Sequence, residues 1–234
     1  NDGIEKVSQR LQKNSPSGFL GINIGPNKNS KNRIDDYLKC IKEINPFANY
    51  ITINISSPNT EKLREFHDAF KLEELINSIE KEKKILKSKI PITLKISPDI
   101  LDNQINEICK ILLNYDIKAI IISNTTDSNR EKLINISKHE KGGLSGKPLE
   151  YRSNQLINKF YSLLKNNVKI IGVGGVDSGK SAYDKFSAGA SYVQLYTGMV
   201  YQGPNIVNKI KKELKDILIK KGVKTFKDII GKKN

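Results

Sequence analysis

The sequence has no apolar run approaching the roughly 20 residues that a membrane-spanning helix needs, so no such helix is expected. Cysteine is also scarce, with only Cys40 and Cys109 among 234 residues. They form neither a CxxC pair nor a metal-ligand spacing, so we expect reduced cysteines packed on helices and no metal site. A signal peptide and an initiator Met are absent. The chain opens Asn1-Asp2-Gly3, which we interpret as the start of a processed or truncated product.

Acidic residues are outnumbered, which gives a formal net charge of +15. Such a balance is typical of proteins that meet nucleic acids, acidic membranes or anionic ligands. The lysines, however, are scattered along every predicted helix and mixed with glutamates. There is no zinc-finger spacing, no aromatic RNA-binding motif and no arginine-rich arm, and codon bias in an AT-rich genome could supply the same lysines. We therefore expect no nucleic-acid partner, and favour an anionic membrane surface or an anionic small molecule.

Short apolar runs alternate with helical patterns six times along the chain. The runs predict strands over 19–24, 50–55, 92–96, 119–122, 168–173 and 192–196. Asp2 and Ser178 are expected to cap the first helix and the helix after the fifth strand, and Gly222 to stop the last long helix. Near-continuous apolar strands separated by helices indicate a parallel sheet covered by helices. No low-complexity linker divides the chain, so residues 1–234 are expected to form a single domain.

Two α/β architectures compete for this pattern. A doubly wound open sheet usually places its ligand at one switch point, often beside a glycine-rich first turn. Here the first turn, residues 25–27, reads Gly-Pro-Asn, and nearly every strand instead ends in polar or glycine residues. Chemistry spread over all strand ends is typical of a (β/α)8 TIM barrel, which has eight strands and about 250 residues. We find about six βα units, so we expect an incomplete barrel whose first two strands are missing.

Residues 54–60, Asn-Ile-Ser-Ser-Pro-Asn-Thr, place two amides and three hydroxyls within seven residues that follow a predicted strand. A single tight turn needs one Pro and one Asn or Ser. The surplus of neutral hydrogen-bonding groups favours a polar, planar ligand, although a capped turn between strand and helix is the alternative. Lys95 lies inside an apolar strand, where an ammonium is costly unless it meets an anion or several acceptors. We expect it to face the ligand rather than to extend its charge into solvent.

Several glycines and Ser57 are the remaining candidate functional residues. The pairs at 142–143 and 174–175, with Gly146, indicate turns whose backbone N–H groups can hold a phosphate, as barrels do near their last strands. A phosphorylated cofactor or substrate is therefore expected. His67 and His139 have no readable triad partner and are interpreted as surface residues. Ser57 is the sharper catalytic candidate, but its hydroxyl needs desolvation and an exit path for its proton.

Seven motifs, in order and spacing, make the chain resemble class 2 dihydroorotate dehydrogenases, the FMN-dependent, quinone-reducing, membrane-associated type. They are GINIG at 21–25, INISSPNT at 53–60, LKISPD at 94–99, SNTT at 123–126, GGLSG at 142–146, GVGG at 172–175 and QLYTG at 194–198. Class 1 relatives place a cysteine where this chain has Ser57. The resemblance implies oxidation of (S)-dihydroorotate to orotate in the synthesis of UMP, with FMN as cofactor and a quinone as acceptor.

The resemblance also assigns roles. It makes Ser57 the base that removes a proton from dihydroorotate. Residues matching the substrate-binding positions are Asn54, Asn59, Asn124 and Thr125. Residues matching the FMN-binding positions are Asn23, Asn54, Lys95, Ser123, Gly146, Gly175, Tyr196 and Thr197. Of these, Lys95 corresponds to the lysine at the flavin pyrimidine edge, and the last four to the shell around the FMN phosphate.

Two departures from the family pattern stand out. The loop after Ser57 reads Glu61-Lys62-Leu63-Arg64, without the usual glycine before Leu-Arg, which puts the flexibility of a lid in question. The family's N-terminal region, with a membrane-binding helical pair, the quinone tunnel and an Asn-Arg-x-Gly-Phe stretch, has no counterpart here. By resemblance the protein is a monomer, peripheral on the cytoplasmic side of a bacterial inner membrane, or on the mitochondrial inner membrane in a eukaryote. The alternatives are a class 1-like flavin dehydrogenase with another acceptor, and an inactive truncated fragment or basic binding domain.

Overall fold

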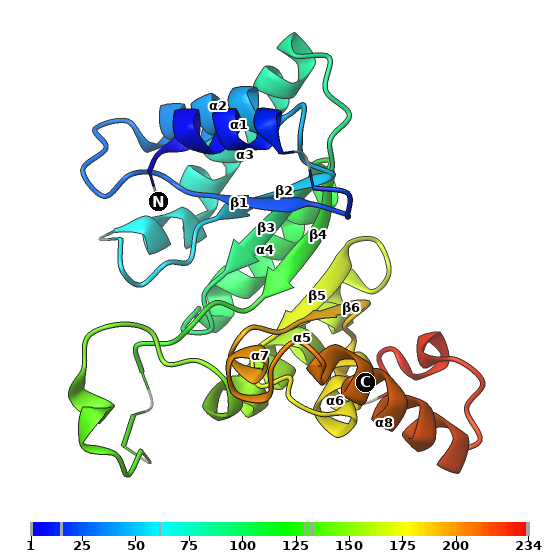
Figure 1. Cartoon of the computed structure of the whole chain (residues 1–234). Helices are drawn as coiled ribbons and strands as arrows, with labels where there is room; N and C mark the ends of the chain where they lie inside the picture. Colours follow the sequence, from blue (N-terminus) through cyan, green and yellow to red (C-terminus); the bar gives the residue numbers. More distant parts are fainter. Residues whose placement is uncertain (1, 15, 61, 129, 132, 233–234) are drawn as a thin grey trace.

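Six parallel strands form one curved sheet in chain order (Figure 1). The computed structural model describes residues 2–14, 16–60, 62–128, 130–131 and 133–232. The strands are β1 Gly21–Ile24, β2 Tyr50–Asn54, β3 Ile92–Ile96, β4 Ile117–Ile122, β5 Lys169–Val173 and β6 Tyr192–Gln194. Within the described residues no ladder joins β6 back to β1, so the sheet is an open half-barrel. The incomplete barrel that the sequence predicts is confirmed.

Helices connect the strands and cover the outer face of the sheet (Figure 1). They are α1 Ile4–Lys13, α2 Arg33–Ile44, α3 Ala69–Ile85, α4 Asp102–Asn114, α5 Glu150–Leu164, α6 Gly179–Ala188, α7 Thr197–Gln202 and α8 Ile206–Lys220. Four 3-10 helices accompany them: η1 Leu63–His67, η2 Ile136–His139, η3 Lys147–Leu149 and η4 Phe226–Ile229. Each helix from α1 to α5 packs on the next helix along the chain, and α6 packs on α8. This is the arrangement expected when every parallel connection crosses over on the same face.

Strand residues alternate between an outer face that packs on the helices and an inner face, which is polar on β2 and β3 but apolar on β4 and β5, where Ala119, Ile121, Ile171 and Val173 cluster. The main core includes Ile53, Leu94 and Ile122 from the strands, with helix residues such as Leu72 and Phe160 packed over them. The inner face behaves differently. Thr52 and Thr93 share a buried hydrogen bond between their Oγ1 atoms at 2.8 Å, across β2 and β3. Hence the concave face offers polar side chains at β2 and β3 beside an apolar patch at β4 and β5, and the convex face packs into the main core.

The N-terminal predictions need two corrections. Asp2 does not cap α1; Gly3 holds the N-cap position without a side-chain cap, and Asp2 pairs instead with Arg10 at 3.0 Å. The predicted buried strand over 19–24 begins only at Gly21, and Phe19 is 81% exposed. Because β1 lies at an open edge, the Phe19 ring stays largely exposed, and it stacks on the ring of Tyr50 at 5.8 Å between centroids. Asn1 lies outside the described residues.

At the other end of the chain, the predicted strand over 192–196 stops at Gln194, because the backbone turns into α7, a short helix that the sequence did not predict. The Ser178 cap is confirmed, since its side chain accepts a hydrogen bond from the Ser181 backbone N–H. Cys40 and Cys109 are free and lie on α2 and α4, as predicted. No helix among the described residues is long and apolar enough to cross a membrane.

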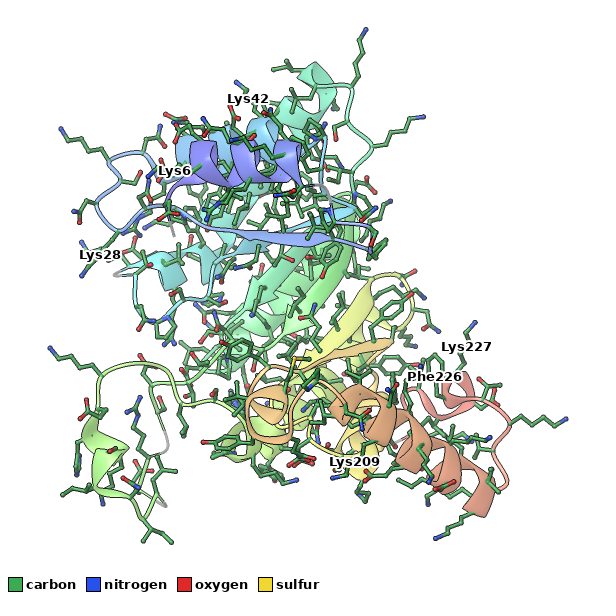
Figure 2. All side chains as sticks on the ribbon, in the orientation of Figure 1. Lys6, Lys28, Lys42, Lys209, Phe226 and Lys227 are labelled. Atoms are coloured by element: carbon green, nitrogen blue, oxygen red, sulfur yellow. The ribbon has the colours of Figure 1, made fainter. Side chains whose placement is uncertain are left out.

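Lysines lie on well-separated parts of the surface. Figure 2 shows Lys6, Lys28 and Lys42 around one end of the molecule, and Lys209 and Lys227 near the other end, beside α8 and η4. Lys42 approaches Glu82 at 3.4 Å, so part of this charge is locally balanced. The lysine side chains therefore follow the scattered pattern that the sequence indicates, with basic and acidic groups mixed over the helices.

Candidate active site

A cavity of about 930 Å³ opens at the edge where β3 to β6 end, and we call it the rim cavity. Parallel strands put all their carboxyl ends on one edge, so segments distant in sequence meet there. Most of the site residues predicted from the sequence line it, namely Lys95, Ser123, Asn124, Thr125, Gly146, Gly175, Tyr196 and Thr197. The convergence on a single edge is thus present in the structure for residues from four strands.

Two glycines let three loops approach one another beside the rim cavity. Gly146 and Gly175 have φ values of 78° and 76°, in the region that favours glycine. A Cβ on Gly146 would lie 2.8 Å from Cγ2 of Thr197, and one on Gly175 would overlap Glu150. Thr197 opens α7, so its backbone N–H has no partner within the helix. A backbone N–H without a partner in its helix, together with close-packed glycines, suits an oxyanion such as phosphate.

An asparagine pair joins the ends of β2 and β4. Oδ1 of Asn54 accepts hydrogen bonds from the Ser56 backbone N–H at 3.2 Å and from the Ser56 hydroxyl at 2.8 Å. The side-chain amide of Asn124 donates to Oγ of Ser56 at 3.0 Å. The Thr125 backbone N–H in turn donates to Oδ1 of Asn124 at 2.8 Å. These bonds fix both amides beside the rim cavity.

Lys95 lies next to this pair, because Asn54 is its register partner across β2 and β3. Burial lowers the pKa of the Lys95 ammonium. No ion pair involving Lys95 occurs in the part of the chain that the structure describes. A half-buried cation that lines a cavity without an acidic partner is well placed to receive an anionic or carbonyl-rich ligand.

Four of the predicted residues are not part of the lining of the rim cavity, namely Asn54, Ser57, Asn59 and Asn23. Ser57 is half-buried, and its Oγ accepts a hydrogen bond from the Asn59 backbone N–H at 3.3 Å. Asn59 lines a neighbouring cavity of about 950 Å³ formed with the loop that contains Arg130. Asn23 is exposed on β1, opposite Thr52 of β2. A Cβ on Gly143 would meet both Thr125 and Pro58, so the Ser57 loop does border the loops that line the rim cavity.

Comparison with known proteins decides the family. A family model described as "Dihydroorotate dehydrogenase" matches residues 1–218. The chain belongs to the dihydroorotate dehydrogenase family. Proteins named "Dihydroorotate dehydrogenase (quinone)" from Idiomarina loihiensis and from a Psychrobacter species are each 41% identical to it, over 220 and 215 residues. These alignments cover 92% and 89% of this chain but 66% and 62% of the relatives. The chain therefore spans slightly less than two thirds of their length.

Solved structures agree with this assignment. The crystal structure of ligand-free dihydroorotate dehydrogenase from Eimeria tenella is similar to the chain with a TM-score of 0.89 and 34% identity. It covers 99% of this chain and 69% of the Eimeria chain. The Eimeria enzyme in complex with ferulenol gives the same TM-score and identity, and covers 98% and 66% of the two chains. The resemblance found in the sequence motifs is confirmed at the level of the family.

The sequence did not predict that arginines connect the loops at the carboxyl edge of the sheet. In this family member nearly all basic residues are lysines, yet three arginines hold loops at the carboxyl edge. Arg64 of η1 contacts Asp99 at 3.2 Å and Asp127 at 2.8 Å, so it joins the segment after Ser57 to the loops after β3 and β4. Arg130 donates to the Glu140 carbonyl, and Arg152 to the Pro98 carbonyl at 2.9 Å. The sequence feature that could have predicted these contacts is the use of arginine at positions 64, 130 and 152 in a lysine-rich chain, because the planar guanidinium suits contacts with several acceptors.

His67 contradicts its predicted surface position. It is only 3% exposed, and its Nε2 accepts a hydrogen bond from the Ser97 backbone N–H at 3.4 Å. Burial, with a smaller contribution from the nearby Arg64 charge, lowers the pKa of His67 to about 4. The reason is local: η1 turns Leu63 and Phe66 into the main core and carries His67 inward with them. His139 is exposed, as predicted, and Glu61 lies outside the described residues.

Proposed function

We propose that the chain oxidises (S)-dihydroorotate to orotate with FMN as cofactor and a quinone as electron acceptor, in de novo pyrimidine synthesis. Residues 1–234 would act as one FMN-binding unit. The observation that carries the proposal is the junction of Asn54, Ser56 and Asn124 beside Lys95 at the rim cavity. It gathers neutral amides and one cation, which suits a flat, carbonyl-rich ring with a carboxylate. The similarity to proteins named as quinone-dependent dihydroorotate dehydrogenases supports the same reaction.

The residues present fit FMN. The rim cavity offers the glycine cradle of Gly146 and Gly175, where any side chain would intrude on the neighbouring loop. Together with Tyr196 and Thr197 these glycines would hold the phosphate through backbone N–H groups. Lys95 and Ser123 would contact the ring system, with Asn23 and Asn54 at its substrate side. When bound, FMN supplies the hydride acceptor.

Ser57 is the proposed base. Its hydroxyl oxygen would take the proton from the ring carbon next to the one that loses hydride, while the proton of the hydroxyl leaves along a hydrogen-bonded path to solvent. This leaves the double bond of orotate. The Asn59 N–H already donates to that oxygen at 3.3 Å, and such a donor stabilises negative charge as it develops there. Asn54, Asn59, Asn124 and Thr125 would orient the substrate through its carboxylate and ring amides. Because Ser57 is half-buried, substrate binding could complete its desolvation.

The test is rapid mixing of FMN-loaded protein with dihydroorotate, while flavin absorbance is followed. Ser57→Ala should lose most of the flavin reduction, by about 100-fold or more, because general base catalysis contributes on that order. FMN binding should persist, since Ser57 does not line the rim cavity. Ser128→Ala serves as control, because this exposed serine follows β4 outside the proposed site. An unchanged reduction rate in Ser57→Ala would overturn the assignment of the base.

The acceptor and the place of reaction form a further part of the proposal. A quinone is soluble in lipid, so a monomer attached peripherally to a membrane surface, on the cytoplasmic side of a bacterial inner membrane, is the arrangement proposed. The alternative is a class 1-like acceptor. Turnover assays with a short-chain quinone, fumarate and NAD separate these readings, and turnover with fumarate or NAD but not with quinone would exclude the proposed acceptor. Flotation with lipid vesicles tests the membrane contact.

A further inference from the structure

Ser56 has no accessible surface at all, although it borders the proposed site. A hydroxyl with 0% exposure must satisfy its hydrogen bonds inside the protein or destabilise the fold. Here it does so with two side chains from different strand ends: it donates to Oδ1 of Asn54 at 2.8 Å and accepts from Nδ2 of Asn124 at 3.0 Å. The hydroxyl of the serine next to the proposed base therefore links the two amides, and Ser56 itself lines neither of the two cavities.

The order of donors and acceptors in this cluster has one consistent direction. Asn124 donates to Ser56, Ser56 donates to Asn54, and Oδ1 of Asn54 also accepts the Ser56 backbone N–H at 3.2 Å. Reversing the Asn54 amide would set its NH2 group against that backbone N–H, two donors facing each other. The NH2 group of Asn54 therefore points away from Ser56. Asn54 itself is the residue that pairs with Lys95 across β2 and β3.

The two asparagines depend on Ser56 unequally. Asn54 has a second anchor in the backbone N–H of residue 56, which Ser56→Ala keeps. The NH2 group of Asn124 donates to the Ser56 hydroxyl at 3.0 Å and, among the described residues, otherwise approaches Oδ1 of Asn54 at a marginal 3.5 Å. Oδ1 of Asn124 is held separately by the Thr125 backbone N–H at 2.8 Å. Loss of the hydroxyl would therefore free the NH2 end of Asn124, while Asn54 keeps its backbone contact.

We propose that Ser56 is a positioning residue that sets the orientation of the Asn124 amide, and through it the affinity for the planar anionic substrate. The inference rests on the proposed function, because it takes Asn124 to be a substrate contact. Only a side chain that both donates and accepts a hydrogen bond, and that is short enough to be buried between the amides, can fill this place. Threonine keeps the hydroxyl, and alanine removes it.

The first experiment is a double-mutant cycle on orotate affinity, read from the change in flavin absorbance of FMN-loaded protein. Ser56→Ala should weaken orotate binding about tenfold while FMN affinity stays within about twofold of the original. On an Asn124→Ala background the same substitution should change orotate affinity by less than about twofold, because the amide it positions is gone. Ser56→Thr should restore most of the affinity. Ser97→Ala is the matched control, since Ser97 is also fully buried after a strand but its hydroxyl oxygen accepts the Asp99 backbone N–H at 3.1 Å.

A second readout needs no cofactor. In the 15N-labelled chain, side-chain amide protons of Asn124, assigned by their loss in Asn124→Ala, should exchange with solvent at least fivefold faster in Ser56→Ala. Those of Asn54 should keep their rate, and neither should respond to Ser97→Ala. Equal effects of Ser56→Ala on both backgrounds of the cycle, or unchanged Asn124 exchange, would overturn the proposal.

Different results would contradict the proposed function and the positioning role of Ser56. If wild-type protein shows no flavin response to orotate or dihydroorotate, the proposed function fails, while the exchange rates still decide whether Ser56 holds Asn124. If wild-type protein binds orotate and Ser56→Ala binds it equally well, the positioning role fails and the proposed function stands.

Discussion

Asn54 and Lys95 lie directly opposite each other at the ends of β2 and β3. Alternation along the strands puts both on the concave face, with Leu94 and Ile53 turned into the helical core. A polar donor and a half-buried ammonium are thus adjacent where the strands stop. The energetic cost of burying the ammonium indicates a position kept for its ligand rather than for stability.

Lys95→Met should weaken FMN binding by about 10- to 100-fold, because a charge-assisted contact to the ligand is lost. The stability of the FMN-free chain should stay the same or rise, since a half-buried charge without an acidic partner is removed. Fluorescence titration with FMN and thermal melts measure the two effects. Lys169→Met is the control, because Lys169 lies on β5 but is exposed. Equal FMN affinities for the two variants would contradict the proposed contact.

Gly146→Ala should weaken FMN binding at least tenfold more than Gly203→Ala does. Both glycines have positive φ, 78° and 73°, so each substitution should destabilise the chain by about 1 kcal/mol. Only at Gly146 would the new methyl group crowd Thr197; at Gly203 no atom lies within 4 Å of it. Comparing unfolding midpoints and FMN titrations separates backbone strain from disruption of the cradle. Equal loss of affinity in both would rule out the cradle.

His67 should make the fold sensitive to acid. Its pKa of about 4 lies below the usual value of 6.5, so between these pH values the unfolded chain binds more protons than the folded one. Stability contributed by the neutral imidazole is complete above pH 6.5 and is lost as pH falls toward 4. The linkage relation puts the loss at about 3 kcal/mol. Urea unfolding of His67→Asn at several pH values should lack this slope, whereas the exposed His139→Asn should retain it.

The isolated chain of 234 residues should bind FMN weakly and tend to aggregate. Among the described residues, β1 and β6 each pair on one side only, and an unpaired strand edge is a template for association. Gel filtration at rising protein concentration and the flavin content of purified protein check this. A monodisperse, yellow protein with one tightly bound FMN per chain would contradict the expectation.

The parallel half-barrel could be predicted because its signals are local. Strand β3 was expected over 92–96 and is found at Ile92–Ile96, since an apolar run between a Pro and a Ser-Pro turn leaves little choice. Helix α7 and the early end of β6 were missed because Tyr-Thr-Gly continues the strand pattern. In the structure Thr197 begins α7 there and packs against Gly146, a contact between segments about 50 residues apart in the sequence.

The sequence by itself determined the family, the order of strands and helices, and which residues carry hydrogen-bonding groups at the strand ends, because these depend on residue type and spacing along the chain. Tertiary structure alone decided which of those groups meet. It linked Asn54 to Asn124 through Ser56, buried His67, and left Ser57 and Asn23 outside the rim cavity lining. Such contacts join residues up to 70 positions apart, and they follow from the curvature and packing of the sheet rather than from any local pattern.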